Sequence, residues 1–158
     1  MATASIGLAR LLALAVPAAL LAGALGSEHI GGLYPCEMCH WQRWPHYAAV
    51  PLALLAIILS DRSIGNLFLW LATLAIFTSG AIGVFHAGVE YGWWEGLTSC
   101  ATTAGGSGDF LADIMATPVI SCDQPQWTLF GVSLAGFNAI ISIGAAMVIA
   151  WLIRRPTR

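Results

Sequence analysis

Long apolar runs alternate with short polar segments along this chain. Four runs are long enough to form helices across a bilayer, at residues 6–26, 44–60, 67–89 and 128–153. A helix needs about 20 mostly apolar residues to cross the hydrocarbon core. Because lipid offers no partner for backbone polar groups, these runs are expected to be α-helical. The pattern predicts an all-α fold: a polytopic membrane four-helix bundle, with residues 1–158 as a single transmembrane domain.

The composition supports a membrane protein. The chain is 58% hydrophobic and 9% charged, has a mean hydropathy of +0.79, and contains no lysine. A soluble domain usually carries about 25% charged residues. This chain therefore lacks the polar surface that an ordinary soluble domain needs.

The first apolar run has a second interpretation. Arg10 followed by Leu11–Leu25 and small residues also resembles a secretory signal peptide, with cleavage near Ala24. Cleavage would leave three helices in the same orientation. Four helices shield a polar site from lipid better than three, so we expect the first helix to be retained.

The arginines predict the orientation of the helices. Five of the six fall at the N-terminus, between the second and third runs, and at the C-terminus, namely Arg10, Arg62, Arg154, Arg155 and Arg158, and only Arg43 lies on the other side. By the positive-inside rule these ends are cytoplasmic, in a bacterial inner membrane. The loops at residues 27–43 and 90–127 then face the oxidising periplasm, where disulfides persist.

The second outer loop is long for a connection, which usually signals function or disorder. Residues 109–115 place apolar side chains on one face and Asp113 on the other, which predicts a short amphipathic helix ended by Pro118. The same pattern also fits a turn packed on its own protein. Trp93, Trp94 and Trp127 flank the loop as interfacial anchors would.

The first outer loop ends in a motif with three chemical interpretations. Cys36-Glu37-Met38-Cys39-His40 has the C-x-x-C-H spacing of covalent haem attachment, and C-x-x-C alone fits half a zinc site or a redox dithiol. The haem interpretation leaves two further cysteines, Cys100 and Cys122, without a role. The loop is also short for enclosing a macrocycle.

A zinc site would need four ligands, and the four cysteines would supply them. The spacing of Cys100 and Cys122 is far wider than that of typical zinc ligands, and a periplasmic site would compete with oxidation of its own ligands. We therefore predict no metal.

The redox interpretation gives every cysteine a role. If a helix begins near Pro35, Cys36 and Cys39 sit at its positive N-terminal end, which stabilises a thiolate. Arg43 follows Cys39 by one turn and would stabilise that thiolate or the oxygen of a reduced acceptor. Pro45 leaves a second possibility open, in which the helix starts only there.

The electrons from such thiols need an acceptor. The sequence contains no dinucleotide fingerprint or P-loop, which argues against a soluble cofactor. A lipid-soluble quinone reaches the top of a helical bundle from the bilayer. Arg43 and His86 offer polar contacts for its carbonyl groups, although a merely packed His86 fits the sequence equally well.

Two of the apolar runs also carry small or polar residues at helical spacing. In the fourth run these are Gly131, Ala135, Asn138, Ser142 and Ala145. Small residues let helices approach closely in lipid, and an intramembrane Asn is expected to face a partner helix.

Three stretches resemble the DsbB family of disulfide-bond-formation proteins. They are Leu33–Pro45 (LYPCEMCHWQRWP), Phe85–Trp94 (FHAGVEYGWW) leading to Cys100, and Ser121–Asp123 followed by Trp127–Asn138 (WTLFGVSLAGFN). The likeness covers essentially the whole chain, and His40 falls at a variable position, which makes the haem-like spelling accidental.

The resemblance implies a bound ubiquinone or menaquinone and a soluble thioredoxin-fold partner of the DsbA type. It implies that the partner attacks Cys100 of a Cys100–Cys122 disulfide, after which Cys122 attacks Cys36. Cys39 is released as thiolate and passes electrons to the quinone. The resemblance also places Arg43 beside Cys39, and His86 or Glu90 near the quinone.

Two other functions fit parts of the sequence. One is a membrane haem carrier that uses the C-x-x-C-H motif. The other is a non-enzymatic membrane protein stapled by disulfides.

Overall fold

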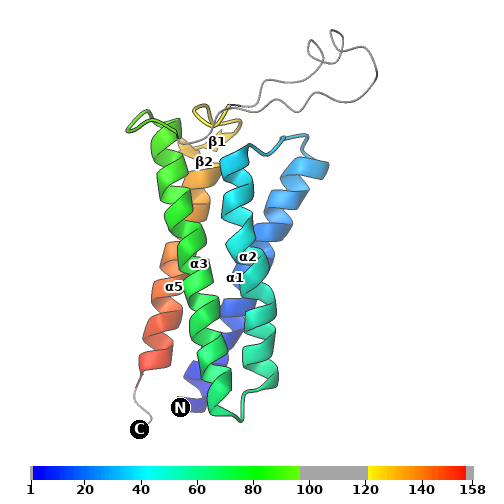
Figure 1. The fold of residues 1–158 in the computed structure, drawn as a ribbon, viewed down its shortest axis with the longest axis vertical. Coiled ribbons are helices and arrows are strands. Elements are labelled where there is room, and N and C mark those ends of the chain that lie inside the picture. The colour runs from blue at the N-terminus through cyan, green and yellow to red at the C-terminus, as the bar shows by residue number, and fades with distance from the viewer. Residues whose placement is uncertain (1, 97–120, 156–158) are drawn as a thin grey trace.

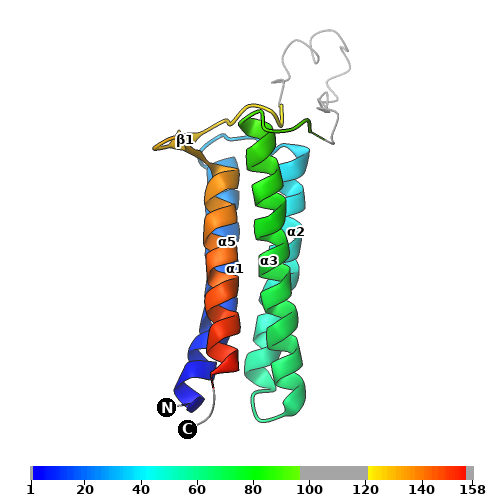
Figure 2. The same ribbon diagram turned by 90° about the vertical axis from the view of Figure 1, so that its left-hand side faces the viewer.

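The computed structural model describes residues 2–96 and 121–155. Within these ranges it contains four long helices and a two-stranded hairpin: α1 (Ala2–His29), α2 (Glu37–Ile58), α3 (Ser63–Glu90), β1 (Thr128–Leu129), β2 (Val132–Ser133) and α5 (Leu134–Arg154). The helices run side by side along one axis, and both termini lie at the same end of the molecule (Figures 1 and 2). The prediction of a helical fold is confirmed, while the predicted helix at 109–115 lies outside the described residues.

The second helix starts close to Pro35. Cys36 is the N-cap of α2, and Pro45 lies inside the helix. Of the two starts left open, near Pro35 or only at Pro45, the structure has the first, and the helix begins before the apolar run at 44–60. A proline inside a helix removes one backbone hydrogen bond but does not compel the helix to end there.

The last helix starts later than expected. Instead of a helix from residue 128, β1 and β2 pair through a tight turn in which Phe130 has φ +51° and Gly131 has φ +78°. Two consecutive residues with positive φ cannot continue a right-handed helix. The Ser133 side chain then caps α5 by accepting from the Gly136 amide at 3.1 Å.

Three of the helices are long and apolar enough to cross a membrane, namely Ser5–His29, Ser63–Glu90 and Leu134–Arg154. The second helix does not meet this criterion, because its outer half carries polar side chains such as Gln42, Arg43 and His46. A membrane crossing by α2 therefore remains a prediction.

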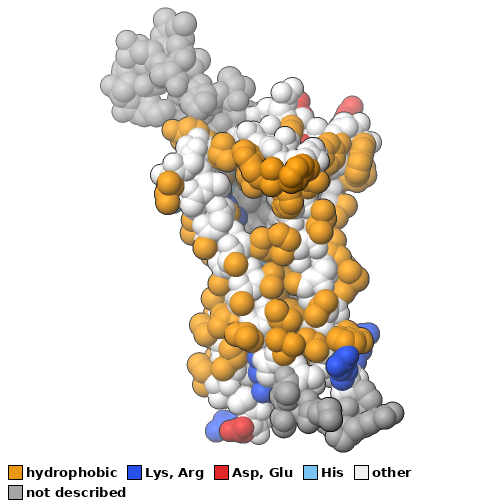
Figure 3. All heavy atoms as spheres, turned by 180° about the vertical axis from the view of Figure 1, so that it is seen from behind, with side chains coloured by type: hydrophobic (Ala, Val, Ile, Leu, Met, Phe, Trp, Pro, Cys, Tyr) orange, Lys and Arg blue, Asp and Glu red, His pale blue; other side chains and the backbone are white. Residues whose placement is uncertain are grey.

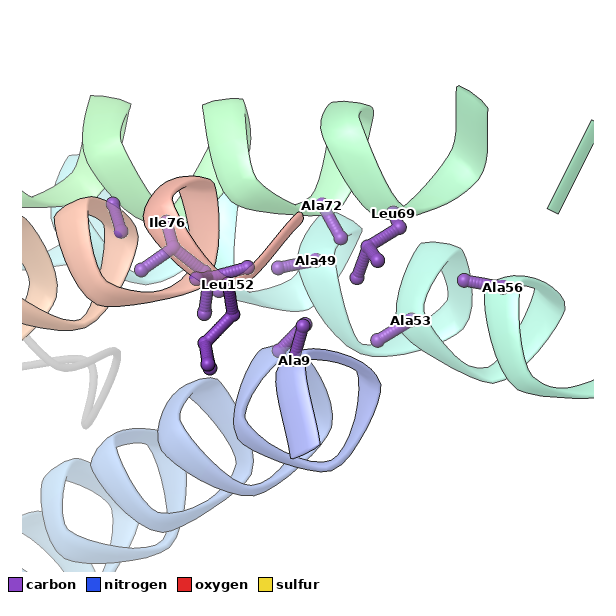
Figure 4. Close-up of a cluster of buried hydrophobic side chains, with 11 residues drawn as sticks. Ala9, Ala49, Ala53, Ala56, Leu69, Ala72, Ile76 and Leu152 are labelled. Carbon is purple, nitrogen blue, oxygen red and sulfur yellow. The ribbon is translucent and has the colours of Figure 1, made fainter. Parts of the chain in front are cut away.

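The core near the end that holds the termini is built mainly from alanine. Ala9, Ala49, Ala53 and Ala72 are fully buried there and pack around larger residues such as Leu152 (Figure 4). Small side chains bring helix backbones close together, which supplies the van der Waals contact that holds helices together in lipid.

The sides of the bundle are apolar and its ends are charged. Large hydrophobic side chains cover the flank seen in Figure 3, and basic side chains gather at the end that carries the termini. At this end Arg10 donates to the Ser60 carbonyl at 3.2 Å, and Arg154 lies over the Trp70 ring at 5.4 Å. A surface of this kind suits a protein surrounded by lipid.

The close packing of α3 against α5 depends on glycine. A Cβ atom on Gly80 would lie 2.7 Å from Cγ1 of Ile143, and one on Gly83 would lie 3.0 Å from the Ala135 carbonyl oxygen. The predicted packing face of the fourth run is thus in contact with α3. Gly131, which we assigned to that face, lies instead in the hairpin turn.

Candidate functional site

The two cysteines of the C-x-x-C motif meet at the outer end of α2. The Cys36 sulfur accepts a hydrogen bond from the Cys39 amide at 3.2 Å, and the two sulfur atoms lie 2.8 Å apart. Cys36 is buried, whereas Cys39 is partly exposed. The short link through Glu37 and Met38 at a helix N-terminus therefore brings both thiols within direct reach of each other.

The two thiols differ electrostatically. The hydrogen bond to Cys39 and burial both raise the pKa of the Cys36 thiol above its ordinary value. The Cys36 thiol is therefore hard to ionise. A thiolate is the form that reacts in disulfide exchange, so the partly exposed Cys39 is the better candidate for the reactive sulfur of the reduced pair.

His86 lies beside Cys36 on the neighbouring helix α3. Its Nε2 atom is 3.5 Å from the Cys36 sulfur and 3.8 Å from Oε1 of Glu90. Gln42 donates from Nε2 to His86 Nδ1 at 2.7 Å, which assigns the proton of a neutral ring to Nε2. His86 therefore presents an N–H toward both the thiol and the carboxylate.

Glu90 joins the end of α3 to the start of α5. Its carboxylate accepts a short hydrogen bond from the Ser133 hydroxyl, the same hydroxyl that caps α5. The Tyr91 hydroxyl donates to the Gly131 carbonyl at 3.0 Å and accepts from the Ser133 amide at 3.1 Å. These bonds fix the hairpin over the thiol site.

Cys122 approaches the site from the second loop. Its sulfur, the Cys36 sulfur and a ring nitrogen of His86 all lie within 4.8 Å of one another, and all three residues are buried. Three donors at this spacing would also suit a soft metal ion, but a closed structural zinc site takes four ligands. Cys100 lies outside the described residues.

Arg43 is held by the first helix. Its guanidinium donates a short hydrogen bond to the Glu28 carboxylate and a second one to the Ala24 carbonyl at 3.2 Å. Both hydrogen bonds go to α1, and the expected stabilisation of a Cys39 thiolate by this cation stays a prediction. Arg43 remains near Cys39, because both residues line the same cavity.

A cavity of about 200 Å³ opens between α1, α2 and α5, directly beneath Cys39. Its walls are largely apolar and include Leu20, Leu134 and Phe137. The polar part of the lining consists of Ser27, Cys39, Gln42, Arg43, His46 and Asn138. His86 and Glu90 line a smaller cavity of about 50 Å³ around Cys36 and Cys39.

Comparison with known proteins identifies a match over nearly the whole chain. The family model for disulfide bond formation protein DsbB matches residues 7–152. The chain belongs to the DsbB family. Family membership makes it a membrane disulfide oxidoreductase that acts in disulfide bond formation.

Individual relatives of the DsbB family agree with this match. Disulfide bond formation protein B of Verminephrobacter eiseniae is 32% identical over 147 residues, covering 89% of this chain and 81% of that protein. The proteins of the same name from Polaromonas sp. and Marinobacter nauticus are 32% and 31% identical, covering 89% and 79% of this chain and 86% and 78% of theirs. No solved structure matches the chain at a significant level.

The site of this DsbB family member contains residues that the analysis of its sequence motifs missed. Gln42 orients His86, and His46 lines the cavity together with Asn138. One sequence signal was present: Cys39, Gln42, Arg43 and His46 recur every three to four residues in a helix that is otherwise apolar. Such a polar stripe inside an apolar helix marks a buried site.

Proposed function

We propose that the chain reoxidises a soluble periplasmic dithiol oxidase of the thioredoxin fold, the DsbA type, and passes the electrons to a membrane quinone. One observation carries the proposal: the Cys39 sulfur lies 2.8 Å from Cys36 and also lines the apolar cavity between α1, α2 and α5. A sulfur that borders both the Cys36 thiol and an apolar cavity would connect disulfide exchange to an acceptor that arrives from the lipid.

The cavity fits the ring of ubiquinone or menaquinone. An engineered cavity of about 150 Å³ is enough to bind benzene, so about 200 Å³ accommodates a substituted ring. Its largely apolar walls would let an isoprenoid tail extend from the ring toward the lipid. Arg43, Gln42, His46 and Asn138 are the polar residues that would hold the ring.

A bound quinone would supply an acceptor for two electrons and two protons. The energetic need for it is clear, because DsbA-type oxidases have potentials near −120 mV and each 30 mV corresponds to about 1.4 kcal/mol for two electrons. Only a strongly oxidising acceptor makes the reoxidation of such a partner favourable.

The thiol steps of the proposal are those that the family resemblance implies. The partner's thiolate attacks Cys100 of a Cys100–Cys122 disulfide, which forms a mixed disulfide and releases Cys122 as thiolate. Cys122 then attacks Cys36 of the Cys36–Cys39 disulfide, which releases Cys39 as thiolate beside the cavity. The closeness of Cys122 and Cys36 sulfurs supports this second exchange. Once the partner's second thiol resolves the mixed disulfide, two electrons and two protons have left the partner.

His86 and Glu90 have a role at the thiols in this scheme. Both face Cys36, and the His86 N–H lies within reach of the sulfur that is attacked and later reprotonated. The prediction that one of them neighbours the quinone remains untested. Their position around the smaller cavity supports proton handling at Cys36 more directly than contact with the ring.

The proposed orientation follows the arginines. The protein lies in the bacterial inner membrane with both termini in the cytoplasm, α2 forms the fourth crossing, and the cysteines face the periplasm. The common location of both termini and the arginine-rich end supports this arrangement.

Anaerobic mixing of the purified protein with a reduced DsbA-type oxidase tests the proposal, with quinone absorbance as the readout. We expect one quinone reduced for every two partner thiols oxidised. The Cys39→Ser variant should abolish quinone reduction, while His40→Ala, which changes an exposed neighbour, should retain it. A full rate of quinone reduction in Cys39→Ser would contradict the proposal.

A further inference from the structure

A cluster of polar side chains crosses the interior of the bundle below the thiols. It joins three helices and consists of Gln42 and His46 on α2, Ser79 on α3, and Asn138 and Ser142 on α5. Polar groups at this depth of a membrane bundle are costly and usually mark a functional site. Gln42, His46 and Asn138 also form part of the cavity wall.

The hydrogen bonds of Ser79 and Asn138 determine where each proton lies. The Ser79 hydroxyl donates to the Gln42 backbone carbonyl at 2.7 Å, and a carbonyl can only accept. Asn138 Nδ2 donates to Gln42 Oε1 at 2.9 Å and to the Ser79 oxygen at 3.1 Å. The Ser79 hydroxyl oxygen and Asn138 Oδ1 are therefore left as acceptors.

Both acceptors face the same nitrogen of His46. Its Nε2 lies 2.8 Å from the Ser79 hydroxyl oxygen and 3.0 Å from Asn138 Oδ1, so Nε2 carries the proton. In a neutral ring the other nitrogen, Nδ1, is then a bare acceptor. Nδ1 has no hydrogen-bond partner among the described residues, and only 3% of His46 is exposed.

Gln42, which lies beside His46 in the cavity wall, can also only accept a hydrogen bond from a ligand. Gln42 uses both amide protons, on the Met38 carbonyl and on His86, which leaves only a lone pair on Oε1. Gln42, His46 and Asn138 thus offer acceptors to a ligand and no free donor, whereas the N–H donors of this cavity belong to Arg43. A quinone carbonyl can only accept a hydrogen bond, whereas a quinol hydroxyl can donate one.

We propose that His46 Nδ1 accepts a hydrogen bond from a hydroxyl of quinol, so that this end of the cavity binds the reduced ring more tightly than the oxidised ring. Because Nδ1 is closed to water in the described state, this hydrogen bond would require a small displacement of the cavity wall. This inference rests on the proposed function, and it adds that the cavity prefers quinol to quinone.

Selective binding of the reduced ring would make the bound acceptor more oxidising. A ligand that binds one state of an equilibrium more tightly shifts that equilibrium by the ratio of the two affinities. A tenfold preference for quinol corresponds to about 30 mV for a two-electron couple. The thiol reaction would gain that driving force without any change in the cysteines.

The test measures two dissociation constants for each variant. Quinone-depleted protein in detergent is titrated anaerobically with short-chain ubiquinone and, separately, with its chemically reduced quinol, by equilibrium dialysis. We expect His46→Phe, which keeps a ring but lacks the acceptor, to weaken quinol binding about tenfold and quinone binding less than about threefold. His46→Leu gives the same comparison if the phenylalanine variant does not fold.

Thr73→Val is the matched control, because it removes a buried hydroxyl of α3 that, among the described residues, bonds to the Leu69 carbonyl alone and does not line the cavity. Its ratio of the two constants should equal that of the wild type. Equal weakening of both ligands by His46→Phe, or equal affinities in the wild type, would overturn the role of His46 and leave the proposed function standing. Failure of the wild type to bind either ligand would overturn both.

Discussion

Arg43 of α2 and Glu28 of α1 form an ion pair at the rim of the cavity beneath Cys39. The pair neutralises the arginine and fixes α1 against α2. It also explains why the guanidinium makes no hydrogen bond to the thiol, since a carboxylate is the stronger hydrogen-bond partner for a guanidinium.

Glu28→Gln should release the Arg43 guanidinium while keeping the size of its neighbour. We expect a loss of stability of about 1–3 kcal/mol, because the Arg43 side chain is only 10% exposed and would lose its carboxylate partner. We also expect Cys39 to react faster with a maleimide at neutral pH, because an uncompensated cation nearby favours its thiolate. Glu37→Gln, an exposed change at the same end, is the control. An unchanged alkylation rate in Glu28→Gln would show that the pair does not influence the thiol.

The proximity of Cys36 and Cys122 predicts a specific disulfide. In a Cys39→Ser, Cys100→Ser double variant these two thiols remain, and mild oxidation should join them within one molecule, because their sulfurs lie within 4.8 Å. Mass spectrometry of unreduced peptides measures the product. The Cys36→Ser, Cys100→Ser variant, which retains Cys39 and Cys122, should form its bond more slowly. Equal rates in the two variants would contradict the described position of Cys122.

Gly88 is the point at which the segment after α3 folds back on the helix. A Cβ atom there would lie 2.1 Å from Cζ2 of Trp94, whose ring stacks on Phe85 and whose Nε1 donates to the Phe85 carbonyl at 2.9 Å. Gly88→Ala should displace Trp94 and lower the free energy of unfolding by about 1–3 kcal/mol.

Gly144→Ala is the matched control for Gly88→Ala, because a Cβ at Gly144 meets nothing within 4 Å and alanine favours a helix. It should leave stability unchanged or raise it slightly. Denaturant unfolding in detergent measures both variants. Equal stabilities of the two would show that Trp94 does not pack on Gly88.

The sequence predicted the helical fold and the residues of the thiol site for physical reasons. Apolar runs in lipid leave the backbone no alternative to helix, and the C-x-x-C spacing brings Cys36 and Cys39 together at a helix end. Cys122 was predicted to meet Cys36 only through the family resemblance, since no local pattern joins residues so far apart.

Other features depended on contacts that local patterns do not encode. The late start of α5 follows from the hairpin turn at Phe130 and Gly131, where tertiary bonds from Tyr91 hold an unfavourable backbone conformation. The pairing of Arg43 with Glu28 depends on how α1 crosses α2. The polar cluster around His46 needs three helices in register before any of its hydrogen bonds can form.

The central claim is that Cys39 borders the site at which quinone binds. The most direct measurement is the rate of maleimide alkylation of Cys39 in a Cys36→Ser, Cys100→Ser, Cys122→Ser variant, with and without short-chain ubiquinone under anaerobic conditions. We predict that saturating quinone slows the alkylation of Cys39 at least about tenfold, because the ring fills the cavity beneath the sulfur. An alkylation rate that does not change with quinone would contradict the account.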